Sequence, residues 1–419
     1  ARIRDRIAGE FDMTFADEAY ARSLAQLRRC LSPAGFLGSP NDIDNYARVW
    51  ARDGIIAGLA AIASGDASLV DGMRSTLLTL ARHQGPHGEI PSNVTADGGK
   101  VSYGHLVGRV DAPLWYVIGV CAYVHHTGDM VYAASALPGV ERALFLVGCW
   151  EFNNRGLLYT PLSGNWADEF ILEGYLLSDQ LLYAMALRNA GVVFQRPAWT
   201  DKAASLLALL EVNYWPRFDA RDDALVYHPH AYRAYLDAHG EPLHWLAAFS
   251  PGGYADRFDG LAHALALLAQ LGGDAQRQQA IAYVQQLSEQ IGSELLPAFW
   301  PVIQPGDLEW QLLQANHLYG MLKNQPFTYH NGGLWAVVTG LYAVGLACCG
   351  QRERAGQLLH AINEANARGR DGQQWEFAEY YHAQTHMPMG TSHVDWSAAA
   401  GILAHQAMRQ DKVASLFFH

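Results

Sequence analysis

The sequence lacks the features that would place the chain in a membrane or on a nucleic acid. No apolar run reaches the roughly 18 uncharged residues that a membrane span needs, and the longest runs, around Gly119 and Gly340, are typical of buried helices. The formal net charge is −12 at pH 7. Because most of such a surface repels phosphates, we expect no nucleic-acid partner and no membrane partner.

Metal-binding motifs are absent as well. There is no CxxC pair and no HExxH, and the adjacent His125 and His126 would point in different directions on a helix, as would His228 and His230. We therefore expect no metal and no cofactor. Reduced thiols, together with a charged start that has no apolar signal core, favour a cytoplasmic location. The five cysteines are Cys30, Cys121, Cys149, Cys348 and Cys349.

Alternating strand patterns are almost missing, whereas helical periodicity recurs along the whole chain. Half of the residues are apolar, and they repeat at i, i+3, i+4 and i+7. Residues 200–210 show the type, with a threonine cap, an acidic first turn and one apolar face. Twelve helices are predicted near 16–30, 53–64, 67–83, 112–127, 138–151, 174–190, 200–214, 257–271, 275–292, 333–349, 351–367 and 395–409.

The predicted helices alternate between two kinds. The odd-numbered ones carry a polar face, whereas the even-numbered ones are apolar nearly all round and must be surrounded by protein. Links inside several pairs are short, such as Ser64-Gly-Asp66 and Thr127-Gly-Asp129, which makes the paired helices antiparallel neighbours. The pattern predicts an all-α fold, an (α/α)6 barrel of six hairpins that forms a single domain over residues 1–419. A two-domain helical bundle is the alternative.

The long loops all precede an inner helix, so the barrel would gather them at one end around a cavity. Each carries aromatic and polar side chains, which suit a carbohydrate because aromatic faces stack on sugar rings while carboxylate, guanidinium and amide groups bind hydroxyls. The expected partner is a small carbohydrate substrate, and the sequence does not reveal the oligomeric state. The loops cover residues 46–54, 108–115, 164–169, 250–259, 329–335 and 375–381, the last followed by Asp395-Trp396-Ser397.

Hydrolysis of a glycosidic bond needs two carboxyl groups, one to protonate the leaving oxygen and, in an inverting enzyme, one to activate water. Each acid in these loops also has a structural reading. Arg52 and Asp53 could be an ion pair, Asp168 could favour a helix start, and Glu379 could be a solvated loop residue. The glycines after Asn331 could simply form a tight turn. Convergence of six loops on one cavity favours the functional reading.

At these residues the sequence resembles a group of (α/α)6 glycosidases that includes neutral and alkaline invertases, trehalases, amylo-1,6-glucosidases and glucoamylases. The resemblance covers nearly the whole chain. It is carried by Gly108-Arg-Val-Asp-Ala-Pro-Leu-Trp-Tyr-Val-Ile, Tyr329-His-Asn-Gly-Gly-Leu-Trp, and Glu379-Tyr-Tyr with the later Trp396-Ser. Order and spacing are most similar to those of the neutral invertases.

The resemblance implies Asp168 as the general acid and Glu379 as the general base. It also implies that Arg52 and Asp53 grip a terminal sugar, which favours an exo-acting enzyme. We expect apolar, tryptophan-rich surroundings to keep Asp168 protonated. The sequence departs from the invertases after the acid, where Glu169-Phe170 replace a basic pair. Candidate substrate-binding residues are Tyr46, Trp50, Arg52, Asp53, Glu89, Asn93, Arg109, Asp111, Trp166, His330, Asn331, Gly332, Trp335, Trp375 and Trp396.

These features predict an inverting exo-glycosidase that releases a terminal sugar, glucose above all, from a small α-glucoside. Sucrose hydrolysis is one alternative. A sugar epimerase on the same barrel is another, with His330 and His393 as candidate acid and base. A carbohydrate-binding protein without activity is the third, against which the intact acid pair argues.

Overall fold

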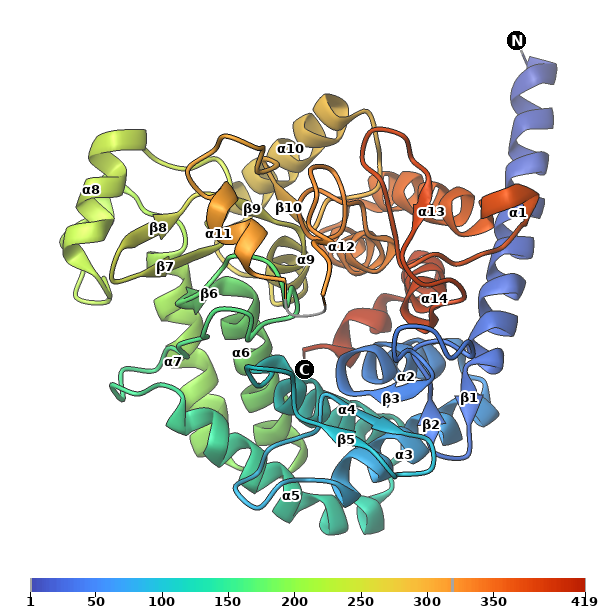
Figure 1. Ribbon diagram of the computed structural model, residues 1–419, viewed down its shortest axis with the longest axis horizontal. Helices are drawn as coiled ribbons and strands as arrows, with labels where there is room; N and C mark the ends of the chain where they lie inside the picture. The colour runs from blue at the N-terminus through green and yellow to red at the C-terminus, as the bar shows by residue number, and fades with distance from the viewer. Residues whose placement is uncertain (1, 318–319, 419) are drawn as a thin grey trace.

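Six helices form the inner layer of a ring (Figure 1). In the computed structural model, which describes residues 2–317 and 320–418, each inner helix packs against the next and the last closes onto the first. The fold is therefore the expected all-α (α/α)6 barrel. The inner helices are α2 (Ala51–Ser64), α4 (Asp111–Thr127), α6 (Leu177–Val193), α9 (Gly260–Leu268), α12 (Ala336–Cys348) and α14 (Asp395–Arg409).

The outer layer is made of the six other predicted helices. Helices α3, α5, α7 and α13 pack on the inner helix that precedes each of them, and α1 packs on α14. Two boundaries differ from expectation by more than three residues: α1 begins at Arg2, and α5 begins at Met130 because Pro138 is accommodated inside it. The outer helices are α1 (Arg2–Arg29), α3 (Ala67–Arg82), α5 (Met130–Cys149), α7 (Pro197–Asn213), α10 (Asp274–Ile291) and α13 (Arg352–Ala367).

The short links work through a glycine followed by an aspartate. Gly65 and Gly128 end α2 and α4 in the left-handed conformation, with φ of 72° and 68°. The next residues, Asp66 and Asp129, then accept hydrogen bonds from the first backbone amides of α3 and α5. Two residues thus stop one helix, start the next and reverse the chain, which is why each pair is an antiparallel hairpin.

Short strands and extra helices occupy the loops, where the sequence predicted none. The strands are two or three residues long, too short for an alternating pattern to be recognised. The sheets are β1 (Leu31–Ser32) with β2 (Gly35–Phe36); β3 (Arg48–Trp50), β4 (Asn93–Thr95) and β5 (Val101–Ser102); β6 (Tyr175–Leu176), β7 (Ala248–Ser250) and β8 (Gly253–Ala255); β9 (Phe258–Asp259) with β10 (Phe299–Trp300); and β11 (Tyr380–Tyr381) with β12 (Pro388–Met389). The additional helices are α8 (Pro229–His239), α11 (Trp310–Ala315) and the 3-10 turns η1 (Phe218–Ala220), η2 (Arg370–Gly372) and η3 (Asp411–Leu416).

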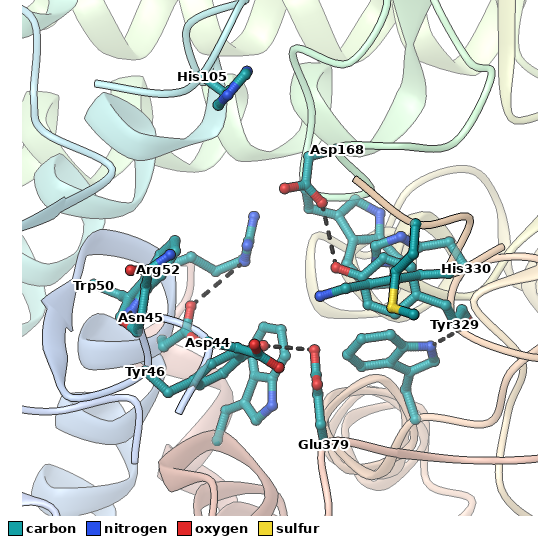
Figure 2. A pocket seen from close by; sticks show the side chains of 16 residues that line it. Asp44, Asn45, Tyr46, Trp50, Arg52, His105, Asp168, Tyr329, His330 and Glu379 are labelled. Carbon is teal, nitrogen blue, oxygen red and sulfur yellow. Dashed lines mark hydrogen bonds and ion pairs between the residues drawn. The ribbon is translucent and has the colours of Figure 1, made fainter. Parts of the chain in front are cut away.

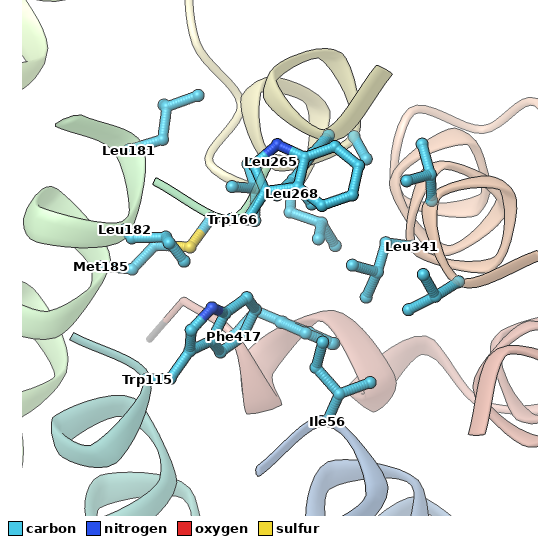
Figure 3. Packing of buried hydrophobic residues seen from close by; sticks show 14 of the residues in the cluster. Ile56, Trp115, Trp166, Leu181, Leu182, Met185, Leu265, Leu268, Leu341 and Phe417 are labelled. Atoms are coloured by element: carbon cyan, nitrogen blue, oxygen red, sulfur yellow. The ribbon is translucent and has the colours of Figure 1, made fainter. Parts of the chain in front are cut away.

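The centre of the ring is filled by side chains rather than open. Trp115 of α4, Ile56 of α2 and Leu341 of α12 converge there with Phe417, which follows η3 near the end of the chain (Figure 3). The Phe417 side chain is fully buried, and its carbonyl accepts a hydrogen bond from Asn189 of α6. One hydrophobic cluster includes residues of all six inner helices. A single domain remains our proposal, and this continuity supports it.

Among the described helices, α5 alone is long and apolar enough to cross a membrane by length and composition. Such a helix is weak evidence for a membrane protein, because core helices pass the same test. Seven α5 residues are buried, and α5 packs against α4. We therefore interpret α5 as an outer helix of the barrel. None of the five cysteines forms a disulfide.

Candidate active site

A cavity of about 410 Å³ opens at the end of the barrel where the long loops meet. Carboxyl, guanidinium and indole groups project into it from loops that are far apart in the sequence (Figure 2). The lining residues that the sequence predicted are Tyr46, Trp50, Arg52, Asp53, Trp166, Asp168, His330, Trp335, Glu379 and Trp396. Those it did not predict are Asp44, Asn45, His105, Met321, Lys323 and Tyr329.

Asp168 and Glu379 face the cavity from opposite sides (Figure 2). Asp168 lies in the loop between α5 and α6. That loop is closed at its base by paired backbone hydrogen bonds between Thr160 and Gly174, of 2.7 and 2.8 Å, and the amide of Val110 binds its Gly164 carbonyl at 2.8 Å. These bonds fix the loop against the start of α4.

The surroundings of Asp168 are more charged than the sequence suggested. Its Oδ2 lies 2.7 Å from a guanidinium nitrogen of Arg109, whose side chain is only 6% exposed and also donates to the carbonyl of Ser163. The hydroxyl of Tyr329 is 3.5 Å from Oδ1. An opposite charge at this distance favours the ionised carboxylate. The structure thus adds a cation beside Asp168 to the surroundings that the sequence predicted, and the protonated state of Asp168 remains a prediction.

Glu379 is held by neutral donors. The hydroxyl of Tyr46 donates to its Oε1 at 2.5 Å, and the backbone amide of Thr391 donates to its Oε2 at 3.0 Å. Burial raises the pKa of Glu379, and the bonds from Tyr46 and Thr391 oppose that rise. Gly390, with φ of 71°, leaves room for the carboxylate, since a Cβ there would lie 2.2 Å from Oε2.

Arg52 and Asp53 lie at the start of α2 and line one side of the cavity. A guanidinium nitrogen of Arg52 donates to Oδ2 of Asp111 at 2.7 Å, and Cζ of Arg52 lies 5.6 Å from the ring centroid of Trp396. Burial by itself lowers the pKa of Arg52, but the negative charges of Asp111 and Asp53 raise it by a larger amount. The net pKa is therefore above its usual value, and Arg52 stays charged. Burial raises the pKa of Asp53 to about 6, although Arg52 opposes the rise.

Aromatic rings form the wall beside Glu379. The ring of His330 stacks on Trp335 with centroids 5.1 Å apart and planes 3° apart, and it meets the edge of Trp166 at 4.9 Å. Trp335 in turn meets Trp396 at 5.5 Å, nearly perpendicular. Burial lowers the pKa of His330 to about 3, so this histidine is neutral. These packed rings offer rigid faces on which a sugar ring can stack.

Several predicted binding residues support the cavity without lining it. Arg109 and Asp111 hold Asp168 and Arg52 by the ion pairs above. Asn93, in β4, accepts a hydrogen bond from Arg48 at 2.9 Å, which joins β4 to β3 just before Arg52. The amide of Asn331 donates to Ile303 and Asn324 carbonyls at 2.9 and 3.2 Å.

Three further predicted residues lie elsewhere. Gly332 has φ of 90°, and a Cβ there would lie 2.4 Å from the side chain of Val302, so it serves a close turn. Glu89 accepts hydrogen bonds from the backbone and ring of His87 and does not line the cavity. Trp375 lies beside α1, 6.2 Å from the ring of Phe15.

The lining residues that sequence reasoning missed come mainly from the cavity mouth. Tyr329 begins the His330 motif, so its position beside a predicted residue was a usable signal. Asp44 and Asn45 have positive φ of 52° and 68°, a conformation that asparagine and aspartate tolerate better than most residues. Lys323 lies 5.5 Å over the ring of Tyr329. Nothing in the sequence around His105 or Met321 indicates their place at the cavity.

The described part of the chain contains no group of three or more histidine, cysteine, aspartate or glutamate residues placed to hold a metal. The two histidines considered for an epimerase are separated. His330 lines the cavity, whereas the ring of His393 lies 3.4 Å from Arg29 of α1 and is not among the lining residues. Both carboxyls considered for a glycosidase therefore line the cavity, whereas of the two histidines considered for an epimerase His330 alone does.

Comparison with known sequences finds neutral invertases. The profile of the alkaline and neutral invertase family matches residues 224–411. "Alkaline/neutral invertase C, mitochondrial" of Arabidopsis thaliana is 23% identical, over 94% of this chain and 67% of that protein. "Cytosolic invertase 1" of Oryza sativa subsp. japonica is 25% identical, over 94% of this chain and 77% of that protein. The match is distant but spans nearly the whole chain.

Solved structures agree on the fold. A GH63 mannosylglycerate hydrolase from Thermus thermophilus, in complex with Tris and D-glycerate, superposes with a TM-score of 0.60 at 14% identity, covering 92% of this chain and 99% of that one. A bacterial glucoamylase complexed with acarbose gives 0.63 at 12% identity, covering 96% and 58%. The expected resemblance to invertases and other (α/α)6-barrel glycosidases is confirmed.

Proposed function

Starting from this kinship with glycoside hydrolases, we propose that the chain is an inverting, exo-acting glycosidase that releases terminal glucose from a small α-glucoside. Asp168 is the general acid and Glu379 the general base. One observation carries the proposal: two carboxyl groups from distant parts of the chain point into one aromatic-lined cavity from opposite sides (Figure 2). Such a pair is what single-displacement hydrolysis requires.

The reaction is a balanced exchange of two protons. A water molecule gives one proton to Glu379 while its oxygen bonds to the anomeric carbon. The bond from that carbon to the leaving oxygen breaks, and the leaving oxygen takes the proton of Asp168. Glu379 suits the base because Tyr46 and Thr391 donate to it, which fixes the carboxylate and favours its ionised form. This chemistry requires no metal or cofactor.

Arg52 and Asp53 are the proposed clamp for the terminal sugar. Both line the cavity and both are nearly buried, with side-chain exposures of 15% and 4%. Buried charged groups bind sugar hydroxyls through strong hydrogen bonds, and a substrate lacking those hydroxyls would leave them unpaired. Trp166, Trp335 and Trp396 supply the faces on which the ring stacks.

Sucrose hydrolysis is the second candidate. It is favoured by the match to the alkaline and neutral invertase profile. It is also favoured by relatives that are named invertases and that are similar to this chain over most of its length. A sugar epimerase lacks support because His393 lies outside the cavity lining. A binding protein without activity would have no use for Glu379 held by two donors. We also propose a cytoplasmic location, while the invertase relatives include cytosolic, mitochondrial and chloroplastic proteins.

The test is a screen of sucrose, trehalose, maltose, isomaltose and glucosyl-glycerate for release of glucose. Proton NMR of the first-formed sugar is expected to show β-glucose from an α-glucoside. Asp168→Asn and Glu379→Gln proteins serve as folded controls that should release no sugar from these substrates. First-formed α-glucose would contradict inversion, and conversion of a sugar to its epimer without hydrolysis would contradict the glycosidase itself.

A further inference from the structure

The acid side of the cavity contains an ion pair that the proposed reaction does not explain. A general acid must carry a proton, yet Asp168 lies 2.7 Å from the guanidinium of Arg109. Arg109 is itself fixed, because its side chain is 6% exposed and donates to the carbonyl of Ser163. Ser163 is anchored in turn by its hydroxyl, which binds the side chain of Asn316 at 3.0 Å.

We propose that Arg109 strengthens Asp168 as an acid, because its charge favours the ionised carboxylate and stabilises the negative charge that Asp168 acquires as it gives up its proton. This inference rests on the proposed function, in which Asp168 is the acid. It makes Arg109 a positioning residue that sets the strength of the acid, since it contacts Asp168 and does not line the cavity.

The geometry fits both halves of the inference. Oδ2 of Asp168 is bound by Arg109, whereas Oδ1 has the hydroxyl of Tyr329 at 3.5 Å, a longer and weaker contact. A leaving-group oxygen that approaches Oδ1 can therefore take a proton there without breaking the pair with Arg109. Once the proton has left, Arg109, whose side chain is 6% exposed, neutralises the new charge.

Arg109 also makes the electrostatic surroundings of Asp168 different from those of Glu379. The charged and titratable groups around Asp168 include Arg109 from the loop before α4, Arg52 of α2, the segment before α12 with Lys323, Tyr329 and His330, and Glu379 from the loop before α14. Arg52 is already paired with Asp111 at 2.7 Å, and His330 is neutral. Arg109 is a cation in direct contact with the acid, at 2.7 Å.

As a consequence, Asp168 carries its proton over a narrower range of pH. A strong acid donates its proton readily but carries it for a smaller part of the pH scale. Removing the positive charge of Arg109 weakens the acid and extends the protonated form to higher pH. Replacing Arg109 by lysine keeps the charge but gives up the fork that reaches both Asp168 and Ser163.

The experiment measures the titration of Asp168 directly. Protein labelled with carbon-13 at the aspartate carboxyls is titrated by NMR, and the resonance of Asp168 is assigned by its loss in Asp168→Asn. In Arg109→Gln the midpoint is expected to move to higher pH by about one unit or more. In Arg109→Lys it is expected to return most of the way to the wild-type value. Circular dichroism checks that both variants fold.

The matched control is Arg354→Gln, which removes a half-buried arginine from an ion pair with Glu294 on the outer layer. It is expected to leave the Asp168 midpoint unchanged. An unchanged midpoint in folded Arg109→Gln, or an equal shift in Arg354→Gln, would overturn the inference. The titration needs no substrate, so failure of every glycoside in the screen would refute the proposed function without deciding the role of Arg109.

If the wild-type protein hydrolyses a glucoside, its pH optimum gives a second readout. Loss of the Arg109 charge is expected to move that optimum to higher pH, whereas a merely structural loss would lower the rate at every pH without moving it. An optimum that stays in place while the NMR midpoint moves would show that Asp168 is not the acid of the reaction, and would overturn the catalytic half of the inference.

Discussion

The two walls of the cavity hold their carboxyl groups in different ways. On one wall, Asp168 is partly exposed and paired with the cation Arg109. On the other, Glu379 is buried and receives hydrogen bonds from the neutral groups of Tyr46 and Thr391. Burial alone therefore does not identify the acid. A buried carboxylate with two donors can serve as a base, and a cation can strengthen an acid whose charge grows during the reaction.

The largest effect on catalysis is expected for a change of Glu379, on the wall where neutral groups bind the carboxyl. Glu379→Gln removes the proposed base, and kcat is expected to fall by about 1,000-fold. The side chain keeps its size, so the melting temperature should change little. Steady-state rates on the best substrate of the screen measure the loss.

Glu309→Gln, which alters an acid paired with Arg257 outside the cavity lining, is the matched control and should keep its rate. If Glu379→Gln kept more than a tenth of the wild-type rate, the assignment of the base would be wrong.

The next effect concerns the donor to the base. Tyr46→Phe deletes the 2.5 Å hydrogen bond to Glu379, which lowers the pKa of that carboxyl. Without the bond the pKa of Glu379 rises further. Because the base acts only when ionised, the acid limb of kcat/KM is expected to move to higher pH, and kcat to fall by about 10-fold. An acid limb that stays in place would show that Tyr46 does not tune the base.

A smaller effect is expected outside the cavity lining, at the buried Asp179 of α6. Burial raises the pKa of Asp179 from 3.8 to about 8. Between these values the folded state keeps a proton that the unfolded chain releases, so the free energy of unfolding falls as pH rises through that window. Asp179→Asn removes this dependence of stability on pH. The asparagine oxygen can still accept the hydrogen bond that the Thr160 hydroxyl donates to Asp179 at 2.7 Å.

Thermal unfolding measured from pH 5 to pH 9 tests this prediction. The melting temperature of Asp179→Asn should gain on that of the wild type as pH rises, by about 2 to 4 °C. Asp237→Asn, an exposed change on α8, should run parallel to the wild type. A constant difference across the range would contradict a proton-linked Asp179.

The smallest effect is expected at Trp375, four residues before the base. Because Trp375 lies against α1 near Phe15, Trp375→Ala should leave kcat/KM within about two-fold. The matched change inside the cavity, Trp396→Ala, is expected to raise KM by about 10-fold, since it removes a stacking face. An equal loss of kcat/KM in both variants would contradict the placement of Trp396 in the cavity lining and of Trp375 outside it.

The sequence predicted the barrel well because the fold depends on local signals. Apolar residues all round α4 and α12, and glycine-aspartate links after α2 and α4, determine which helices are inner and which are paired. Short strands such as β11 escaped prediction because two residues show no period. The single-domain reading and the roles of the site residues remain predictions.

The candidate site could be predicted only in part. Residues in loops directly before inner helices, such as Arg52 and His330, reach the cavity because the barrel gathers those loops at one end. Which side chain lines the cavity and which supports it depends on loop packing between distant segments. Arg109 therefore pairs with Asp168 instead of facing a ligand, and Lys323 reaches the mouth from a loop with no recognisable motif.

The most direct test of the two-wall account compares leaving groups. Asp168→Asn and Glu379→Gln are each assayed on the best sugar substrate and on α-glucosyl fluoride, whose leaving group needs little help from an acid. We expect Asp168→Asn to lose activity on the sugar substrate but to keep most of its rate on the fluoride, and Glu379→Gln to lose activity on both. Rescue of Glu379→Gln by the fluoride, with Asp168→Asn inactive on both, would reverse the two roles and contradict the account.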